Sequence, residues 1–161
     1  MKTIALFGHR FIFNEHKLKE KITALLNETI PQGFSNILIG CHGDFDKIAL
    51  KALLNYKNYV NNNITINVVL TSLSLLKKDE YGFSGVDFYK KSNCETIFFD
   101  IEEVYYKNRI TYSNKKMVDN CDLVICCVDM KSYKSGAKTA VNYAIKQNKK
   151  IINLYEPRKK K

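Results

Sequence analysis

The chain has 161 residues, 45% of them hydrophobic and 26% charged, and a formal net charge of +10. This length is typical of one globular domain, and the composition excludes a disordered chain, a collagen and a coiled coil. No apolar run approaches the roughly 20 residues of a membrane span, and the apolar start of the chain is too short for a secretory signal, so we expect a soluble, cytoplasmic protein.

The first half of the chain predicts strands and helices in alternation. Asn14 is placed to cap a helix whose apolar residues follow one face as far as Ile30, before Pro31 and Gly33 end it. A second helix is expected from about Asp44, with an inward face that continues to Val60. Short apolar runs are typical of buried strands; we expect them at 3–7, 37–39 and 64–70.

The second half begins with residues 71–93, which are rich in aromatics, contain two glycines and show no clear period. We expect a functional loop or lid there, because a long loop without structure is uncommon in a domain. Periodicity predicts one helix from about Glu102 to Asn120 and another that opens at Gly136 and turns Ile145 inward. The expected strands are 96–99, 123–128 and 151–154.

Strands that alternate with helices favour an α/β fold. We expect a Rossmann-like open parallel sheet of about five main strands with helices on both faces. No linker or internal repeat divides the chain, so we expect a single domain over residues 1–157 and a disordered basic tail over 158–161.

Five cysteines are present, and their spacing matches neither a disulfide framework nor a zinc finger. Cys126 and Cys127 lie in an apolar run and are expected to be buried. Cys41 and His42 lie near two aspartates, but this spacing fits no standard ligand set. We expect no metal and no cofactor.

In an open parallel sheet, ligands bind beyond the carboxyl ends of the strands. The first such end carries Gly8, His9 and Arg10. Glycine permits a sharp turn and a close approach of a ligand to the backbone, and arginine offers a planar fork for a phosphate or carboxylate. The alternative is a plain turn with an ion-paired arginine.

The second strand ends in a loop with two glycines, Gly40 and Gly43, that predict a tight backbone cradle. His42, Asp44 and Asp46 follow in the same loop. Aspartates at a helix start serve as caps and suit the helix dipole, but they repel a phosphate. This loop is therefore expected to bind hydroxyls or a base.

The strand over 123–128 is followed by Asp129 and a helix start at Ser135, Gly136 and Ala137. Backbone N–H groups at a helix start form an anion site, although a serine cap alone also explains the pattern. Asn114 is expected to face inward from its helix, where a polar side chain needs a partner; a ligand or a core hydrogen bond would supply it.

These motifs resemble the SLOG superfamily, Rossmann-like domains that include the cytokinin-activating LOG enzymes and the DNA-processing protein DprA. The likeness is to a small bacterial branch of standalone members and covers nearly the whole chain up to Glu156. It rests on Phe7-Gly8-His9-Arg10, on Cys41-His42-Gly43-Asp44-Phe45-Asp46, on Asn114, Lys115 and Met117, and on Ser135-Gly136-Ala137. The resemblance implies a pocket for a nucleotide or an ADP-ribose-like molecule, and a homodimer.

Two residues depart from the family pattern. Ser113 stands where the family has an arginine, and Ser135 replaces the first glycine of a pair. LOG enzymes cleave a nucleotide's N-glycosidic bond with an arginine and a helical glutamate, but no acidic residue occurs here between Gly136 and Asn153. The sequence therefore favours a ligand-binding or sensor protein over a LOG-type hydrolase.

The basic charge keeps nucleic-acid binding as a further alternative. Four of the positive charges are the tail residues Arg158 to Lys161, and the remaining lysines show no single stripe along the sequence. A diffuse charge is a weak footprint for nucleic acid, so a nucleotide-derived small molecule is the expected partner.

Overall fold

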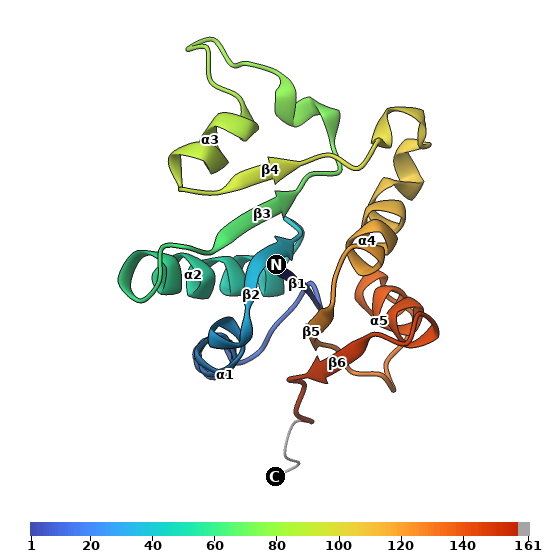
Figure 1. Cartoon of the computed structure of the whole chain (residues 1–161). Coiled ribbons are helices and arrows are strands. Elements are labelled where there is room, and N and C mark those ends of the chain that lie inside the picture. The colour runs from blue at the N-terminus through green and yellow to red at the C-terminus, as the bar shows by residue number, and fades with distance from the viewer. Residues whose placement is uncertain (158–161) are drawn as a thin grey trace.

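Six strands form one open sheet in a computed structural model that describes residues 1–157. The strands are β1 (Lys2–Gly8), β2 (Phe34–Ile39), β3 (Thr65–Val69), β4 (Glu95–Ile97), β5 (Leu123–Cys127) and β6 (Lys150–Asn153). Their order is β4-β3-β2-β1-β5-β6, and each neighbouring pair is parallel (Figure 1). The Rossmann-like prediction is confirmed, with the short β4 as a sixth strand at one edge.

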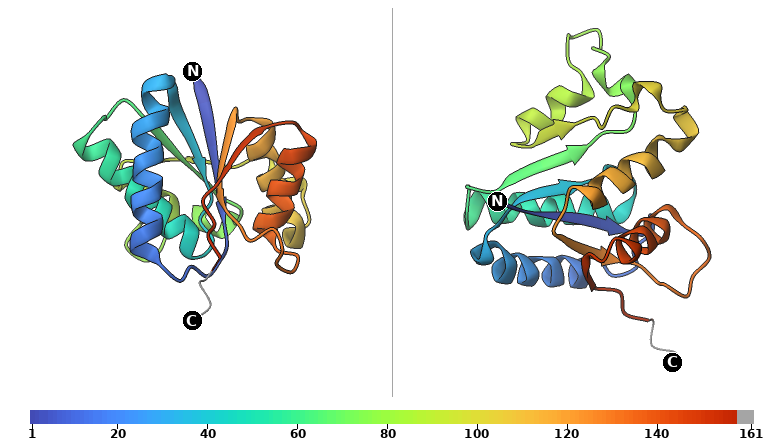
Figure 2. Two further views of the ribbon diagram at one scale, coloured as in Figure 1. Left: turned by 90° about the horizontal axis from the view of Figure 1, so that it is seen from below. Right: turned by 45° about the vertical axis from the view of Figure 1, so that its right-hand side comes forward.

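Helices cover both faces of the sheet. They are α1 (Glu15–Thr29), α2 (Asp44–Tyr59), α3 (Gly85–Lys91), α4 (Arg109–Asp119) and α5 (Gly136–Lys146). In the view from below, α1 and α2 lie on one side of the strands and α4 and α5 on the other (Figure 2). Ile4 and Leu6 of β1 belong to the first core, whereas Ala5 and Phe7 belong to the second, as the two-residue period of a strand requires.

Two expected helix caps are confirmed. The Asn14 side chain accepts a hydrogen bond from the backbone N–H of Lys17 at 3.1 Å. The Ser135 side chain accepts one from the N–H of Lys138, also at 3.1 Å, and thereby fixes the start of α5. Both caps satisfy N–H groups that have no partner inside the helix.

The prediction of one helix from Glu102 to Asn120 is wrong over the first third of that range. Residues 101–103 and 106–108 form separate 3-10 turns, and α4 begins only at Arg109. Tyr105 between the turns has extended backbone (φ −54°, ψ 131°), and the Arg109 guanidinium donates to the Val104 carbonyl at 3.0 Å. The chain therefore turns a corner here rather than continuing one helix.

Three smaller expectations are also corrected. Residues 71–93 are not irregular throughout, because they contain a 3-10 turn and α3. Val60 is 63% exposed and Ile145 55% exposed, so neither faces the core. Val60 lies just beyond the end of α2, and Ile145 lies in the last turn of α5.

No helix in the described range 1–157 is long and apolar enough to cross a membrane. Cys126 and Cys127 are buried as expected. The basic tail expected to be disordered, residues 158–161, lies outside the described residues.

Candidate functional site

A cavity of about 240 Å³ lies at the carboxyl edge of the sheet, where the chain order switches between β1 and β5. The structure places all but three of the sequence-predicted site residues around it. Its lining is Leu6, Phe7, Gly8, His9, Arg10, Gly40, His42, Asp46, Ile110, Asn114, Ser135, Gly136 and Ala137. Ile110 and the apolar residues of β1 were not expected, and they give the cavity an apolar wall.

The start of α2 is closed by the chain itself. The backbone N–H of Asp44 donates to the Arg10 carbonyl at 2.8 Å, and that of Phe45 lies 3.4 Å from the His9 carbonyl. Gly43 permits this close approach, because its φ is +90° and a Cβ there would lie 2.7 Å from the Arg10 Cα. The two carbonyls thus occupy the first amides of α2, and the N–H groups of Asp44 and Phe45 are not free to bind an anion.

Asp46 supplies the acidic side of the cavity. Its Oδ2 accepts a hydrogen bond from the backbone N–H of His42 at 2.7 Å. Burial raises the pKa of Asp46 to about 7, although the His42 N–H favours the charged form. Near neutral pH this carboxyl group therefore exists in both protonation states and can accept or donate a hydrogen bond to a hydroxyl.

His42 contributes a neutral ring. Its Nε2 lies 2.8 Å from Oγ1 of Thr71 at the end of β3. Burial lowers the pKa of His42 below its ordinary value, and the nearby Arg10 guanidinium lowers it further. The imidazole is therefore uncharged at physiological pH, so it adds a hydrogen-bonding group and no positive charge.

The cavity also offers free donors. The backbone N–H groups of Gly136 and Ala137 make no hydrogen bond with any described residue, and both residues line the cavity. The exposed Arg10 guanidinium forms no ion pair within residues 1–157. Free amides at a helix N-terminus and an arginine are the groups that bind phosphate in proteins.

Asn114 lines the cavity from α4 and is half-buried. Its side-chain amide has no hydrogen-bond partner among the described residues, so both its oxygen and its nitrogen are available. The neighbouring Ser113 does not line the cavity and is fully buried, and its hydroxyl is also unpartnered within that range. Of the two polar residues, Asn114 is the one that can meet a ligand.

Three predicted site residues lie outside the cavity lining. Gly43 packs against Arg10, and the Asp44 carboxylate accepts from the backbone N–H of Ile12 at 3.1 Å. The backbone N–H of Asp129 donates to Nε2 of His9 at 2.8 Å, and its carboxylate accepts from the Tyr155 hydroxyl at 3.2 Å. These residues hold the loops in place, and the Asp129 contact fixes the orientation of the His9 ring.

Cys41 does not join a metal site. Burial, and to a smaller extent the Asp46 carboxylate, raises the pKa of its thiol to about 11, so the thiolate is disfavoured. In the part of the chain that the structure describes, no group of three or more His, Cys, Asp or Glu side chains could hold a metal ion.

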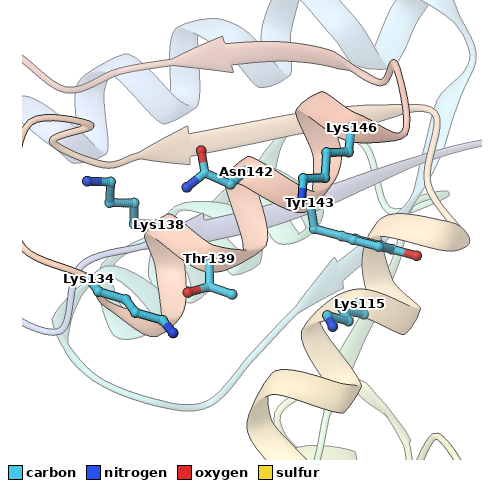
Figure 3. Close-up of a pocket in the computed structure, with 7 residues that line it drawn as sticks. All are labelled: Lys115, Lys134, Lys138, Thr139, Asn142, Tyr143 and Lys146. Carbon is cyan, nitrogen blue, oxygen red and sulfur yellow. The ribbon is translucent and has the colours of Figure 1, made fainter.

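A second hollow, which we call the lysine groove, was missed in the sequence. It has a volume of about 400 Å³ and is lined by Lys115, Lys134, Lys138, Thr139, Asn142, Tyr143 and Lys146. Lys134 lies directly before the cap of α5, five of the others belong to α5, and Lys115 comes from α4 (Figure 3). Lys115 is at least 19 residues away in the sequence from the other three lysines, so only the fold reveals that they cluster.

No known protein family and no curated protein matches this chain. The solved structures do include a similar fold. The chain superposes on DNA processing protein A from Helicobacter pylori with a TM-score of 0.64 at 17% identity, over 97% of this chain and 66% of that one. That protein is described as binding single-stranded DNA. The similarity establishes that the two share a Rossmann-like fold.

Proposed function

We propose that the cavity at the carboxyl edge binds a nucleotide or a nucleotide-derived molecule such as ADP-ribose. One observation carries this proposal: two free helix amides, an arginine, a carboxyl group and a free side-chain amide all line one cavity. A nucleotide carries the matching groups, because an anionic phosphate is joined to a neutral, hydroxyl-rich ribose.

The phosphate belongs at Gly136 and Ala137, because their N–H groups are the free donors at a helix start. Arg10 adds the charge that this site needs. The phosphate cannot bind at the start of α2, because carbonyls already occupy the amides there and the Asp46 carboxylate would repel it.

The ribose hydroxyls belong at Asp46 and Asn114, whose side chains offer both acceptors and a donor. The apolar wall formed by Phe7 and Ile110 then suits the flat face of a base. This arrangement supports a binding protein, because it recognises each part of a nucleotide without a pair of carboxylates across a scissile bond.

A LOG-type hydrolase is the second candidate, and Asp46 is the observation that favours it. A carboxyl group with a pKa of about 7 is suited to general acid–base chemistry near neutral pH. Under this alternative Asp46 would handle the proton during cleavage of the N-glycosidic bond. No further carboxylate lines the described cavity to stabilise the ribosyl cation.

The test is a thermal-shift series with AMP, ADP, ATP, NAD, ADP-ribose and cyclic ADP-ribose. A ligand at about a hundred times its Kd stabilises a protein by about 2.7 kcal/mol, which raises Tm by several degrees in a domain of this size. We expect one of these ligands to give such a shift in the wild type and not in Arg10→Ala. Lys47→Ala removes an exposed cation from α2 and serves as the control.

Chromatography of the same samples separates the two candidates. Intact ligand after prolonged incubation supports binding alone, whereas release of a free base that is lost in Asp46→Asn supports the hydrolase. The absence of a shift with every nucleotide at millimolar concentration would contradict both.

A further inference from the structure

The lysine groove collects positive charge that no acid of the described chain neutralises. Lys115, Lys134 and Lys146 are exposed, and none forms an ion pair within residues 1–157. Lys138 donates to a carbonyl of the loop before α5 at 2.7 Å, and its other N–H groups have no partner in that range. None of the described carboxylates lines the groove. Four like charges therefore share one groove, which favours an anionic partner.

The charges follow α5 over a considerable length. Lys138, Asn142 and Lys146 recur at every fourth residue. This step puts about 6 Å between successive members of the row and about 12 Å between its two ends. Lys115 adds a charge from α4, next to the ring of Tyr143 (Figure 3). A single phosphate or carboxylate is far shorter than this row, so the groove suits an elongated anion.

The groove has no aromatic face that is free for stacking. Tyr143 is the only aromatic residue that lines it. The Tyr143 hydroxyl donates to Asp119 at 2.7 Å, its ring packs against the second core, and the Lys115 ammonium lies 5.6 Å from the ring centre. Grooves that hold single-stranded nucleic acid combine positive charge with stacked bases. The lysine groove has the charge without the stacking surface, which favours a different kind of polyanion.

Two uncharged polar side chains lie among the lysines. The amide of Asn142 has no hydrogen-bond partner among the described residues. The Thr139 hydroxyl donates to the Ser135 carbonyl at 2.9 Å, and its oxygen can still accept a hydrogen bond. An extended peptide has unpaired backbone N–H and C=O groups that need such partners, whereas a helical peptide pairs most of its own.

We propose that the lysine groove binds an extended acidic segment of a partner protein. Alternate side chains of an extended chain lie on one face, about 6.6 Å apart. This distance is close to the step of the row formed by Lys138, Asn142 and Lys146. Carboxylates on that face pair with the lysines, while Asn142 and Thr139 bond the peptide backbone. The groove is separate from the cavity at Arg10, so this proposal does not depend on the nucleotide proposal.

The first test measures binding of a fluorescent peptide, in which four glutamates alternate with serines, to the full chain at low salt. The variant K115Q/K134Q/K146Q should bind this peptide about eightfold more weakly, because each exposed charge pair contributes a factor of about two. The variant keeps Lys138 and its contact with the Ser132 carbonyl, so the loop before α5 stays in place. Equal binding of the wild type and this variant would overturn the proposal.

The matched control is K47Q/K78Q/K90Q, which removes the same charge from exposed lysines outside the groove. It should bind the acidic peptide within about twofold of the wild type, as expected for charges that do not contact it. An equal loss in both triple variants would contradict the proposal, because net charge and not the groove would then explain binding.

The second test addresses the extended form of the peptide. Asn142→Ala should weaken binding about fivefold, as for one lost hydrogen bond, and leave the salt dependence unchanged. An alanine-rich peptide with four glutamates at every fourth residue carries them along one helix face. It should bind at least about fivefold more weakly than the alternating peptide, because its backbone is paired internally. An unaffected Asn142→Ala, or a helical peptide that binds equally well, would refute an extended partner.

The third test compares the acidic peptide with anions that carry phosphate. A single-stranded oligonucleotide of the same charge and vesicles that contain an anionic phospholipid should both bind more weakly than the peptide. They should also bind the wild type and K115Q/K134Q/K146Q alike. If either one bound more tightly than the peptide and lost that binding in the groove variant, the groove would recognise phosphate, and the acidic-segment proposal would be wrong.

Discussion

Gly8 and Gly136 both line the cavity, but their surroundings differ. A Cβ built on Gly8 would lie 2.1 Å from Cγ of the buried Phe45, so this glycine lets α2 pack against β1. A Cβ on Gly136 would meet no protein atom within 4 Å. Gly136 therefore leaves room for a ligand, whereas Gly8 leaves room for the chain itself.

Gly136→Ala should keep the free energy of unfolding within about 0.5 kcal/mol of the wild type, as for surface substitutions in general. It should also weaken nucleotide binding by at least about tenfold, since a methyl group would stand where the phosphate approaches the amides. Denaturant unfolding and calorimetry measure the two effects. Gly8→Ala should do the reverse and cost about 1–3 kcal/mol of stability, because it overpacks the core. Full affinity in Gly136→Ala would place the ligand elsewhere.

Asp46 makes stability depend on pH in a defined direction. Burial raises its pKa from 3.8 to about 7, so the folded state favours the protonated carboxyl group. This contribution to stability is complete below about pH 4 and is lost as the pH rises through about 7. The side chain in Asp46→Asn cannot ionise, so this pH-dependent contribution to stability is absent from the variant. Urea unfolding from pH 4 to 8 should therefore show that the variant gains stability relative to the wild type as pH rises, and parallel profiles would contradict the assignment.

Most of the candidate site follows from sequence, because parallel strands bring their carboxyl ends to one edge. Gly8, Asp46 and Ser135 each follow or open an element that periodicity predicts, so their proximity was predictable. The role of Gly8 was not, since it depends on the ring of Phe45. The lysine groove was not predictable either, because only the packing of α4 on α5 brings Lys115 close to the lysines of α5.

At the scale of elements, α3 combines a helix cap with partial packing, because Val86 and Tyr89 pack against the core. It has seven residues, none of them buried. The Ser84 hydroxyl accepts from the Asp87 N–H at 3.2 Å, and the Asp87 carboxylate accepts from the Ser84 N–H at 2.9 Å. A helix this short is unstable alone in water, so this capping box adds to the stability that α3 gains from packing.

Ser84→Ala should remove about 1 kcal/mol from the local stability of α3. Amide hydrogen exchange over 85–91 should then accelerate roughly fivefold, while amides of β3 exchange as in the wild type and serve as the internal control. Acceleration throughout the sheet would show instead that α3 is part of the global unfolding unit.

The capping box is also the feature that would have predicted α3, because Ser84 and Asp87 have the spacing of a helix start. The mistaken helix over 102–120 has a different cause. Helical periodicity is present only from Arg109 onward, and the exposed Tyr105 and Tyr106 precede it. When periodicity is averaged over a sequence window that includes both residues 102–108 and the helix after them, the two segments look like one helix. Only the contact of Arg109 with the Val104 carbonyl shows where the chain turns.

At the scale of the whole molecule, ion pairs join the segment after β6 to the first helix, α1. Glu156, after β6, accepts from Lys17 and Lys21 of α1, both at 2.6 Å. The Lys21 ammonium also donates to the Leu154 carbonyl at 3.2 Å. These contacts join the first helix to the edge strand of the opposite half of the sheet, across the carboxyl edge where the cavity lies.

The ion pairs of Glu156 with Lys17 and Lys21 predict that stability depends on pH in the direction opposite to that for Asp46. Hydrogen bonds from Lys17 and Lys21 lower the pKa of Glu156 from 4.5 to about 2. Its contribution to stability is therefore present above about pH 4.5 and is lost as the pH falls towards 2. Glu156→Gln should be less stable than the wild type at pH 7, and the gap should close during acidification.

The control is Glu20→Gln, which also removes one negative charge; within residues 1–157, Glu20 has His16 as its one ion-pair partner, at 3.0 Å. An isolated exposed pair contributes little, so this variant should match the wild type at pH 7. Urea unfolding at pH 3, 5 and 7 measures all three proteins. If Glu156→Gln and Glu20→Gln were indistinguishable at pH 7, the two lysine contacts would not stabilise the fold.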